Sequence, residues 1–263
     1  MPSLKVYTGP FKGYYYFSPQ ILKSVQTKQN DFIVILPVNR AVRLFRRKLI
    51  DTSPDKVLIN PPVFTFNDIL LQLYRTIPGA KRVITGEMLH LIVENILDKK
   101  ISELKYLSSG GSAADSLVKK TTEIITELRR FGYDSTEFEN IQISDKSDTP
   151  LKYDNFRILL NALDKQFGHH LIDEPFALHT AAKILNENQF QSHFPAVKNI
   201  YISGYGLFTP AMFLLIEKLS NWCDVHLKLE HQIDNPDLFA HTQAAMERFT
   251  SMNAQIIESE NQN

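Results

Sequence analysis

The first place where this chain could do chemistry is TGPFKGYYY, residues 8–16. A phosphate-binding loop uses glycines to curl the backbone around phosphate, a lysine to neutralise it, and a hydroxyl to hold magnesium. Here Gly9 and Gly13 are one position too close together, and Lys12 precedes the second glycine instead of following it. Tyr14 to Tyr16 stand where the lysine and hydroxyl are needed. We interpret Gly9, Lys12 and Gly13 as a degenerate phosphate loop.

The second place is the end of the apolar segment 200–202, where the sequence continues Ser203-Gly204-Tyr205. Enzymes that hydrolyse nucleoside triphosphates need a carboxylate at such a strand end to hold magnesium. None is present, so Ser203, Gly204 and Tyr205 are interpreted as degenerate positions of the metal-binding Walker B motif. We therefore predict no catalytic residue, no cofactor and no ATP turnover for this chain.

The sequence contains little support for a metal site, a reactive cysteine or an acid–base pair. His169, His170 and His179 do not make a metal site, because adjacent residues of a helix point to different sides. Cys223, the single cysteine, excludes an internal disulfide framework and is interpreted as a buried, inert thiol at the entry to a strand. An α/β enzyme acting on sugars or nucleotides would need an acid–base pair, and the sequence offers no candidate.

The composition is that of a globular protein without a global charge. The 263 residues include 29 Lys and Arg against 29 Asp and Glu, so any attraction to nucleic acid must come from a local patch. No apolar run approaches the roughly 20 residues that span a bilayer, and the N-terminus lacks the apolar core of a secretory signal. A cytoplasmic location without membrane contact is expected.

One local basic patch has helical spacing. Arg40, Arg43 and Arg47 form one stripe of a predicted helix, with Arg46 and Lys48 beside it. The stripe is either a solvated face or a surface that contacts phosphates. Three further groups are interpreted more simply. The tyrosines 14–16 are assigned to packing in preference to a base-stacking platform, and the pairs Lys119–Lys120 and Arg129–Arg130 to surface charge.

Apolar segments and helical patterns alternate at both ends of the chain. Such alternation favours a parallel sheet in an α/β fold. From Thr85 to Glu187 the sequence instead predicts helices and loops without a strand, including a helix whose apolar face carries Leu117, Ile124, Ile125 and Leu128. Residues 1–84 and 188–263 are thus expected to form a discontinuous α/β core, and residues 85–187 an inserted helical subdomain. The predicted strands are residues 4–9, 31–38, 56–60, 63–66, 199–203 and 224–230.

Three segments, in chain order, resemble the N-terminal helicase-like region of the AddB family, whose members belong to bacterial ATP-dependent helicase–nucleases. FIVILPVNRAVRLFRRKLI is similar to a strand, turn and helix with the family's P-x-x-x-A turn. PPVFTFNDILLQLYR resembles a strand that ends in Thr-Phe-His-Ser in active helicases. IYISGYGLFTPAMFLLIEKLSNWCDVHLKLE resembles a strand, Asp-Gly-Phe, Phe-Thr-Pro, helix and strand; Ser203 replaces the aspartate and Tyr205 the phenylalanine, while Phe208-Thr209-Pro210 is retained.

The resemblance implies a P-loop-NTPase-like core with an inserted all-helical subdomain, inactive as an ATPase, in a helicase–nuclease that repairs DNA double-strand breaks. Its role would be weak binding of single-stranded DNA or assembly with the partner subunit. In active relatives the turns that correspond to those after residues 32–37 and 63–66 lie on the edge that holds single-stranded DNA, which implies Arg40, Arg43, Arg47, Thr65 and Asn67 as nucleic-acid-binding residues. The family's nuclease and its iron–sulfur cysteines lie beyond residue 263. The alternative is a non-catalytic protein-interaction domain that does not bind DNA.

Overall fold

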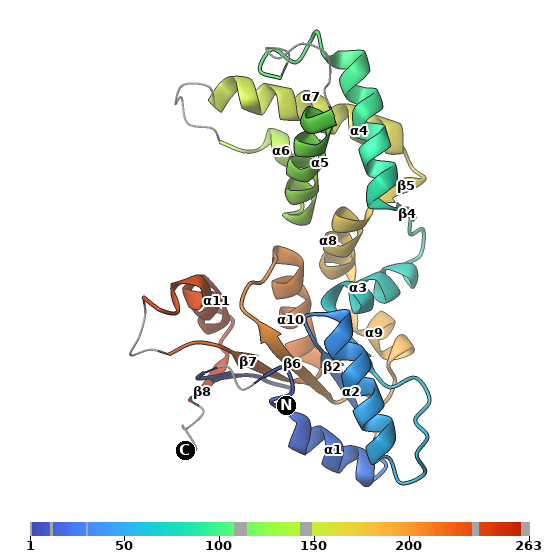
Figure 1. Cartoon of the computed structure of the whole chain (residues 1–263), viewed down its shortest axis with the longest axis vertical. Coiled ribbons are helices and arrows are strands. Elements are labelled where there is room, and N and C mark those ends of the chain that lie inside the picture. The colour runs from blue at the N-terminus through green and yellow to red at the C-terminus, as the bar shows by residue number, and fades with distance from the viewer. Residues whose placement is uncertain are drawn as a thin grey trace. The chain divides into compact units, whose positions relative to one another are not determined.

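The computed structural model describes residues 2–10, 13–29, 31–107, 115–142, 149–232 and 237–258 (Figure 1). Lys12, assigned above to the degenerate phosphate loop, lies outside these residues. The chain divides into two units, one formed by residues 1–76 with 184–263 and the other by residues 77–183. We describe each unit by itself.

Unit 1 contains a six-stranded sheet with the order β3-β2-β6-β7-β1-β8, in which every neighbouring pair is parallel (Figure 1). The predicted fold class, α/β with a parallel sheet, is confirmed. The strands are β1 (Leu4–Thr8), β2 (Phe32–Ile35), β3 (Val63–Phe64), β6 (Asn199–Tyr205), β7 (Asp224–Leu229) and β8 (Gln255–Glu258).

All four residues of β2 are buried, as is usual for a parallel strand that is covered on both faces. Phe32 and Val34 pack with Ile21 and Phe45 of α1 and α2, in a core that also includes Val63 of β3. The helices are α1 (Ser18–Gln26), α2 (Asn39–Thr52), α3 (Phe66–Arg75), α9 (Glu187–His193), α10 (Pro210–Trp222) and α11 (Ala240–Ser251).

Two of the strand expectations for unit 1 need correction. The strand predicted at residues 56–60 is wrong, because Lys56 and Asn60 have left-handed backbone angles, φ 53° at each, that no strand accommodates. Ile59, part of that apolar run, is 90% exposed. Conversely, β8 was not predicted, since this edge strand is short and its residues are half-buried or exposed.

Unit 2 is mainly helical, but it also has a small parallel sheet of two strands. The expectation of no strand between Thr85 and Glu187 is therefore wrong at Leu171–Asp173. Three residues are too few to show an alternating pattern in the sequence. The elements are β4 (Arg82–Ile84), α4 (Gly86–Lys100), α5 (Asp115–Arg130), α6 (Ser135–Glu139), α7 (Thr149–Phe167), β5 (Leu171–Asp173) and α8 (Glu174–Ile184).

A buried arginine connects these elements. Arg129 of α5 is fully buried, so its assignment to surface charge is wrong. It forms ion pairs with Asp164 of α7 and with Asp173, whose Oδ2 lies 3.3 Å from its Nε, and its guanidinium lies 4.9 Å from the ring centroid of Phe176. Burial raises the pKa of Asp173, and the charge of Arg129 opposes that rise. Asp164 also accepts a hydrogen bond from the Ser135 amide at 2.8 Å, which fixes the start of α6.

We expect Arg129→Met to lower the free energy of unfolding by about 3–5 kcal/mol, because it leaves the buried carboxylate of Asp173 and the half-buried carboxylate of Asp164 without their partner. Urea unfolding followed by far-UV circular dichroism measures the effect. The matched control is Arg130→Met, the next residue, which pairs with Glu127 on the surface and should cost less than about 1 kcal/mol. Equal losses for the two variants would show that the buried cluster is not a major source of stability.

Candidate nucleic-acid interface

The candidate site lies at the carboxyl edge of the sheet in unit 1. Because β3, β2 and β6 are parallel neighbours, the turns that follow them lie side by side at this edge. In open α/β sheets, ligands bind outside the carboxyl ends of the strands. The turn after β2 leads into α2, the turn after β3 into α3, and β6 ends at the positions interpreted as a degenerate Walker B motif.

The predicted basic stripe lies on the exposed face of α2. Arg40, Arg43 and Arg47 are all exposed, and Arg47 lies 4.0 Å from the carboxylate of Asp51. Within the part of the chain that the structure describes, no carboxylate lies within ion-pair distance of Arg40 or Arg43. The first turn of α2 has no acidic residue. Cations near a helix N-terminus are unfavourable, and a bound anion would relieve this repulsion.

The neighbouring basic residues have structural partners instead. Arg46 donates from Nε to the Val63 carbonyl at 3.0 Å, and its guanidinium lies 5.7 Å from the ring centroid of Phe64. It thereby connects α2 to β3. Lys48 donates to the Ser18 hydroxyl at 3.1 Å. The exposed arginines are thus distinct from the cations that hold the fold together.

Thr65 and Asn67 lie at the start of α3. Thr65 is the N-cap: its hydroxyl accepts from the Asp68 amide at 3.2 Å and donates to Oδ2 of Asp68 at 2.8 Å. This capping box stabilises the first turn of the helix. Asn67 is exposed in the same turn. The structure therefore assigns a local role to the Thr65 hydroxyl and leaves the Asn67 amide on the surface.

Tyr205 joins the strand ends, a role that the sequence pattern did not predict. Its hydroxyl donates to the Leu36 carbonyl at 2.7 Å and lies 3.4 Å from the Phe66 amide nitrogen, which donates to it. Its ring meets that of Phe66 edge-on, with centroids 4.9 Å apart. Burial raises the pKa of Tyr205, so the hydroxyl stays protonated. The sequence did contain one signal for this role. Tyr205 replaces the phenylalanine of the family pattern, and the hydroxyl of a buried tyrosine requires a hydrogen-bond partner.

The residues predicted to be a degenerate phosphate loop make contacts within the protein. The Gly9 amide donates to the His231 carbonyl at 2.8 Å, in a bridge that follows β1. The ring of Tyr14 lies against Gly204, whose φ is +86°; a Cβ added there would be 2.4 Å from Tyr14 Cδ1 and 3.1 Å from Pro37 Cγ. The Gly9 amide and the space over Gly204 are therefore both taken by groups of the protein.

The adjoining tyrosines pack as predicted. Tyr15 stacks on Phe45 with centroids 5.1 Å apart, and its hydroxyl donates to the Ala41 carbonyl at 3.3 Å. Tyr16 meets Phe17 edge-on at 4.8 Å. The packing interpretation is confirmed for these two rings.

Ser203 is buried, and its Oγ has no hydrogen-bond partner among the described residues. The cavity that it lines with Tyr14, Tyr15 and Phe17 has a volume of about 10 Å³. A single water molecule needs about 10–15 Å³ of such volume. The space beside Ser203 is therefore too small for a phosphate or a hydrated magnesium ion.

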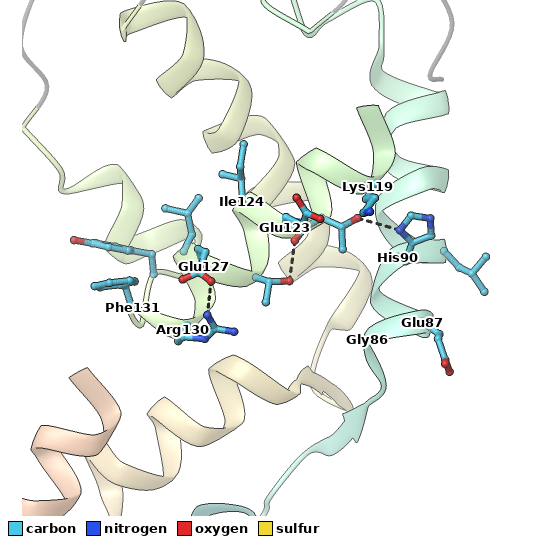
Figure 2. Close-up of a pocket in the computed structure, with 14 residues that line it drawn as sticks. Gly86, Glu87, His90, Lys119, Glu123, Ile124, Glu127, Arg130 and Phe131 are labelled. Carbon is cyan, nitrogen blue, oxygen red and sulfur yellow. Dashed lines mark hydrogen bonds and ion pairs between the residues drawn. The ribbon is translucent and has the colours of Figure 1, made fainter. Parts of the chain in front are cut away.

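Unit 2 carries a different feature, an open groove of about 1040 Å³ between α4 and α5 (Figure 2). Its walls include the exposed apolar side chains of Leu91, Ile124 and Phe131, with exposed fractions of 62%, 44% and 55%. Figure 2 shows Glu123 and the Glu127–Arg130 ion pair on α5 around it. Ile124 was predicted to share the apolar face of its helix with Ile125, but only Ile125 is buried.

Neither a metal cluster nor a membrane span is found in the ranges that the structure describes. These residues contain no group of three or more His, Cys, Asp or Glu side chains arranged to hold a metal ion. No helix within the same ranges is long and apolar enough to cross a membrane.

Comparisons with known proteins agree on one family. The family model described as "ADDB, N-terminal" matches residues 14–262. The chain is 22% identical over 204 residues to the B subunit of the ATP-dependent helicase/deoxyribonuclease of Alkaliphilus metalliredigens, covering 76% of this chain and 17% of that protein. The protein of the same description from Geobacillus kaustophilus is 24% identical over 187 residues, covering 66% of this chain and 15% of that protein.

The chain thus spans about a sixth of the length of the curated relatives that it matches. The match to the family model, in contrast, covers nearly the whole chain, including five of the six strands of the large sheet, the basic stripe of α2 and the groove. The chain belongs to the AddB family and corresponds to its N-terminal region.

Proposed function

We propose that this chain is a catalytically inactive helicase-like domain of a DNA double-strand-break repair helicase–nuclease, where it contacts single-stranded DNA in the cytoplasm. The observation that carries the proposal is the pair Arg40 and Arg43, exposed at the start of α2 on the carboxyl edge of the sheet. The names of the relatives, which describe a helicase and deoxyribonuclease subunit, support DNA as the ligand. A nuclease would belong to the part of such a protein that this chain does not cover.

Three observations support inactivity toward ATP. The Gly9 amide is bonded to His231, the ring of Tyr14 fills the space over Gly204, and Ser203 offers neither a carboxylate nor room for magnesium. Phosphoryl transfer depends on positioning phosphate and metal together. The groups needed to bind phosphate and those needed to bind magnesium are missing at different residues, so the proposal of inactivity does not depend on a single contact.

Isothermal titration with Mg-ATP should accordingly give no binding heat at millimolar nucleotide. An active helicase titrated in the same buffer serves as the positive control. A dissociation constant in the micromolar range would contradict the proposal that this domain has lost its nucleotide site.

DNA binding through the stripe should be weak and sensitive to salt. The chain has no net charge to attract a polyanion, so only the local cations contribute. If Arg40, Arg43 and Arg47 neutralise three phosphates of a single strand, the logarithm of the affinity falls with the logarithm of salt with a slope of about −2.

Replacing Arg40, Arg43 and Arg47 by glutamate should abolish binding of a fluorescent single-stranded oligonucleotide at low salt, measured by anisotropy. The matched control replaces Lys23, Lys28 and Lys198 by glutamate, at basic residues that are exposed in unit 1 outside the carboxyl edge. It makes the same change in net charge and should retain binding. Unchanged binding by the arginine variant would exclude this surface as the site. A wild-type chain that binds no oligonucleotide would favour the protein-interaction alternative.

The groove of unit 2 favours a second role, assembly with the partner subunit of the helicase–nuclease. Exposed apolar patches of this kind usually mark contacts with other molecules. The relatives are named as subunits of a larger enzyme. Glu87 and Glu123 beside the apolar side chains suit an amphipathic helix of that subunit with basic residues along its margins.

Leu91→Gln combined with Phe131→Gln should weaken association with the co-expressed partner subunit by at least about tenfold, because interface energy concentrates in buried large side chains. Size-exclusion chromatography and quantitative pull-down of the purified subunits measure this. Leu207→Gln, a change of another highly exposed leucine in unit 1, is the control and should leave association intact. Equal association of all variants would exclude the groove as the contact surface.

A further inference from the structure

Two aromatic residues that line the groove of unit 2, Phe131 and Tyr133, stand on either side of a glycine at the end of α5 (Figure 2). Gly132 has a left-handed φ of +88°, which is the usual backbone for a glycine that ends a helix. The Gly132 amide donates to the Arg129 carbonyl and the Tyr133 amide to the Leu128 carbonyl, each at 3.0 Å. The position of Gly132 therefore determines where both aromatic side chains meet the groove.

Gly132 in turn lies against the ring of His179, a residue of α8. A Cβ added at Gly132 would be 2.4 Å from both Cε1 and Nε2 of His179, which leaves no room for a side chain. The imidazole also stacks on Phe176, with ring centroids 6.4 Å apart and an angle of 14° between the planes. His179 thus connects α8 to the turn that carries Phe131 and Tyr133.

The surroundings of His179 favour the neutral imidazole. Its Nδ1 is buried and has no hydrogen-bond partner among the described residues. Burial lowers the pKa of His179, and so does the charge of Lys183, whereas the charge of Glu137 on α6 opposes the change. Lys183 and Glu137 also form an ion pair with each other at 3.4 Å. A proton on Nδ1 would be a buried donor without an acceptor, which is costly.

The other charges near His179 belong to the buried cluster of Arg129. The Arg129 guanidinium lies 4.9 Å from the ring centroid of Phe176, the ring on which His179 stacks. The carboxylates of Asp164 and Asp173 are already paired with Arg129. A protonated His179 would thus be a second cation at the Phe176 ring, while these carboxylates neutralise the first.

We propose that His179 is a positioning residue for the groove, whose neutral ring supports the turn at Gly132 and whose protonation loosens that turn and weakens binding of the partner helix. This inference rests on the proposed second role, assembly with the partner subunit. His179 acts through Gly132 on Phe131 and Tyr133, so it controls the shape of the groove without contact with the partner.

The direction and size of the effect follow from the titration of the imidazole. An unperturbed histidine has a pKa of about 6.5 and the pKa of His179 is lower, so its ring is neutral at pH 7.5 and gains a proton as the pH falls below about 6.5. If the partner binds only the neutral form, its affinity at pH 5.5 falls by no more than about tenfold.

The test measures association of the co-expressed partner subunit with wild type, His179→Leu and His90→Gln at pH 7.5 and at pH 5.5. Leucine places an apolar side chain against Gly132 and cannot be protonated, so His179→Leu should lose less affinity on acidification than wild type. His90 is the control, because it is a histidine of the groove itself, with Nδ1 3.5 Å from Oγ1 of Thr122. His90→Gln should keep the pH dependence of wild type. Titrating groups of the partner contribute equally to all three measurements.

Nuclear magnetic resonance of the unaltered chain gives a measurement that needs no partner. The backbone amide shifts of Phe131 and Tyr133 should follow the titration of the His179 ring, with one common midpoint. Amide shifts that ignore this titration would overturn the inference, as would equal pH dependence of association in wild type and His179→Leu. If Leu91→Gln combined with Phe131→Gln still weakens association, the proposed role of the groove stands without the histidine. Association that no change at the groove affects would overturn both.

Discussion

The hydroxyl of Tyr205 lies where β2, β3 and β6 end, and it bonds to the backbone of the segments that follow the first two. Those segments lead into α2 and α3, and the candidate residues of the interface lie on these two helices or, for Thr65, at the N-cap of α3. One side chain thereby fixes the start of both helices relative to the third strand. The exposed groups can remain polar and lightly packed because the buried hydroxyl and the Thr65 capping box hold the backbone beneath them.

The two sides of the candidate site differ in the groups that occupy them. Aromatic rings, a serine and a backbone bridge occupy the positions that we propose to be a degenerate nucleotide site. The arginines of α2, in contrast, stay on the surface, where packing does not explain their number or position. The contribution of the buried groups to stability therefore explains the residues on the inner side of the edge. For the exposed arginines on the outer side we propose contact with a ligand.

The sequence was sufficient for features that depend on continuous patterns. The buried run of β2 and the spacing of apolar residues in α2 predicted a parallel sheet and an exposed arginine stripe. The sequence did not predict burial correctly at positions where a partner far away along the chain decides whether a side chain is covered. The sequence predicted Arg129 as surface charge, whereas in the structure it is buried and pairs with Asp164 and Asp173 of other elements. The sequence placed Ile124 on the apolar face of its helix, but among the described residues no neighbour covers that side of α5. The strand predicted at residues 56–60 does not form because Lys56 and Asn60 have left-handed backbone angles, which the composition of the segment does not reveal.

The contact between Tyr14 and Gly204 also limits which substitutions this edge can accept. An aspartate introduced at position 203 alone would be a buried carboxylate in a cavity of about 10 Å³, lined largely by aromatic and aliphatic side chains. Such a charge without a partner is strongly unfavourable. Removing Tyr14 first would open the space but leave Gly9 bonded to His231. A nucleotide site at this edge would therefore require changes at several positions together, because a change at any one of them leaves another group in the way.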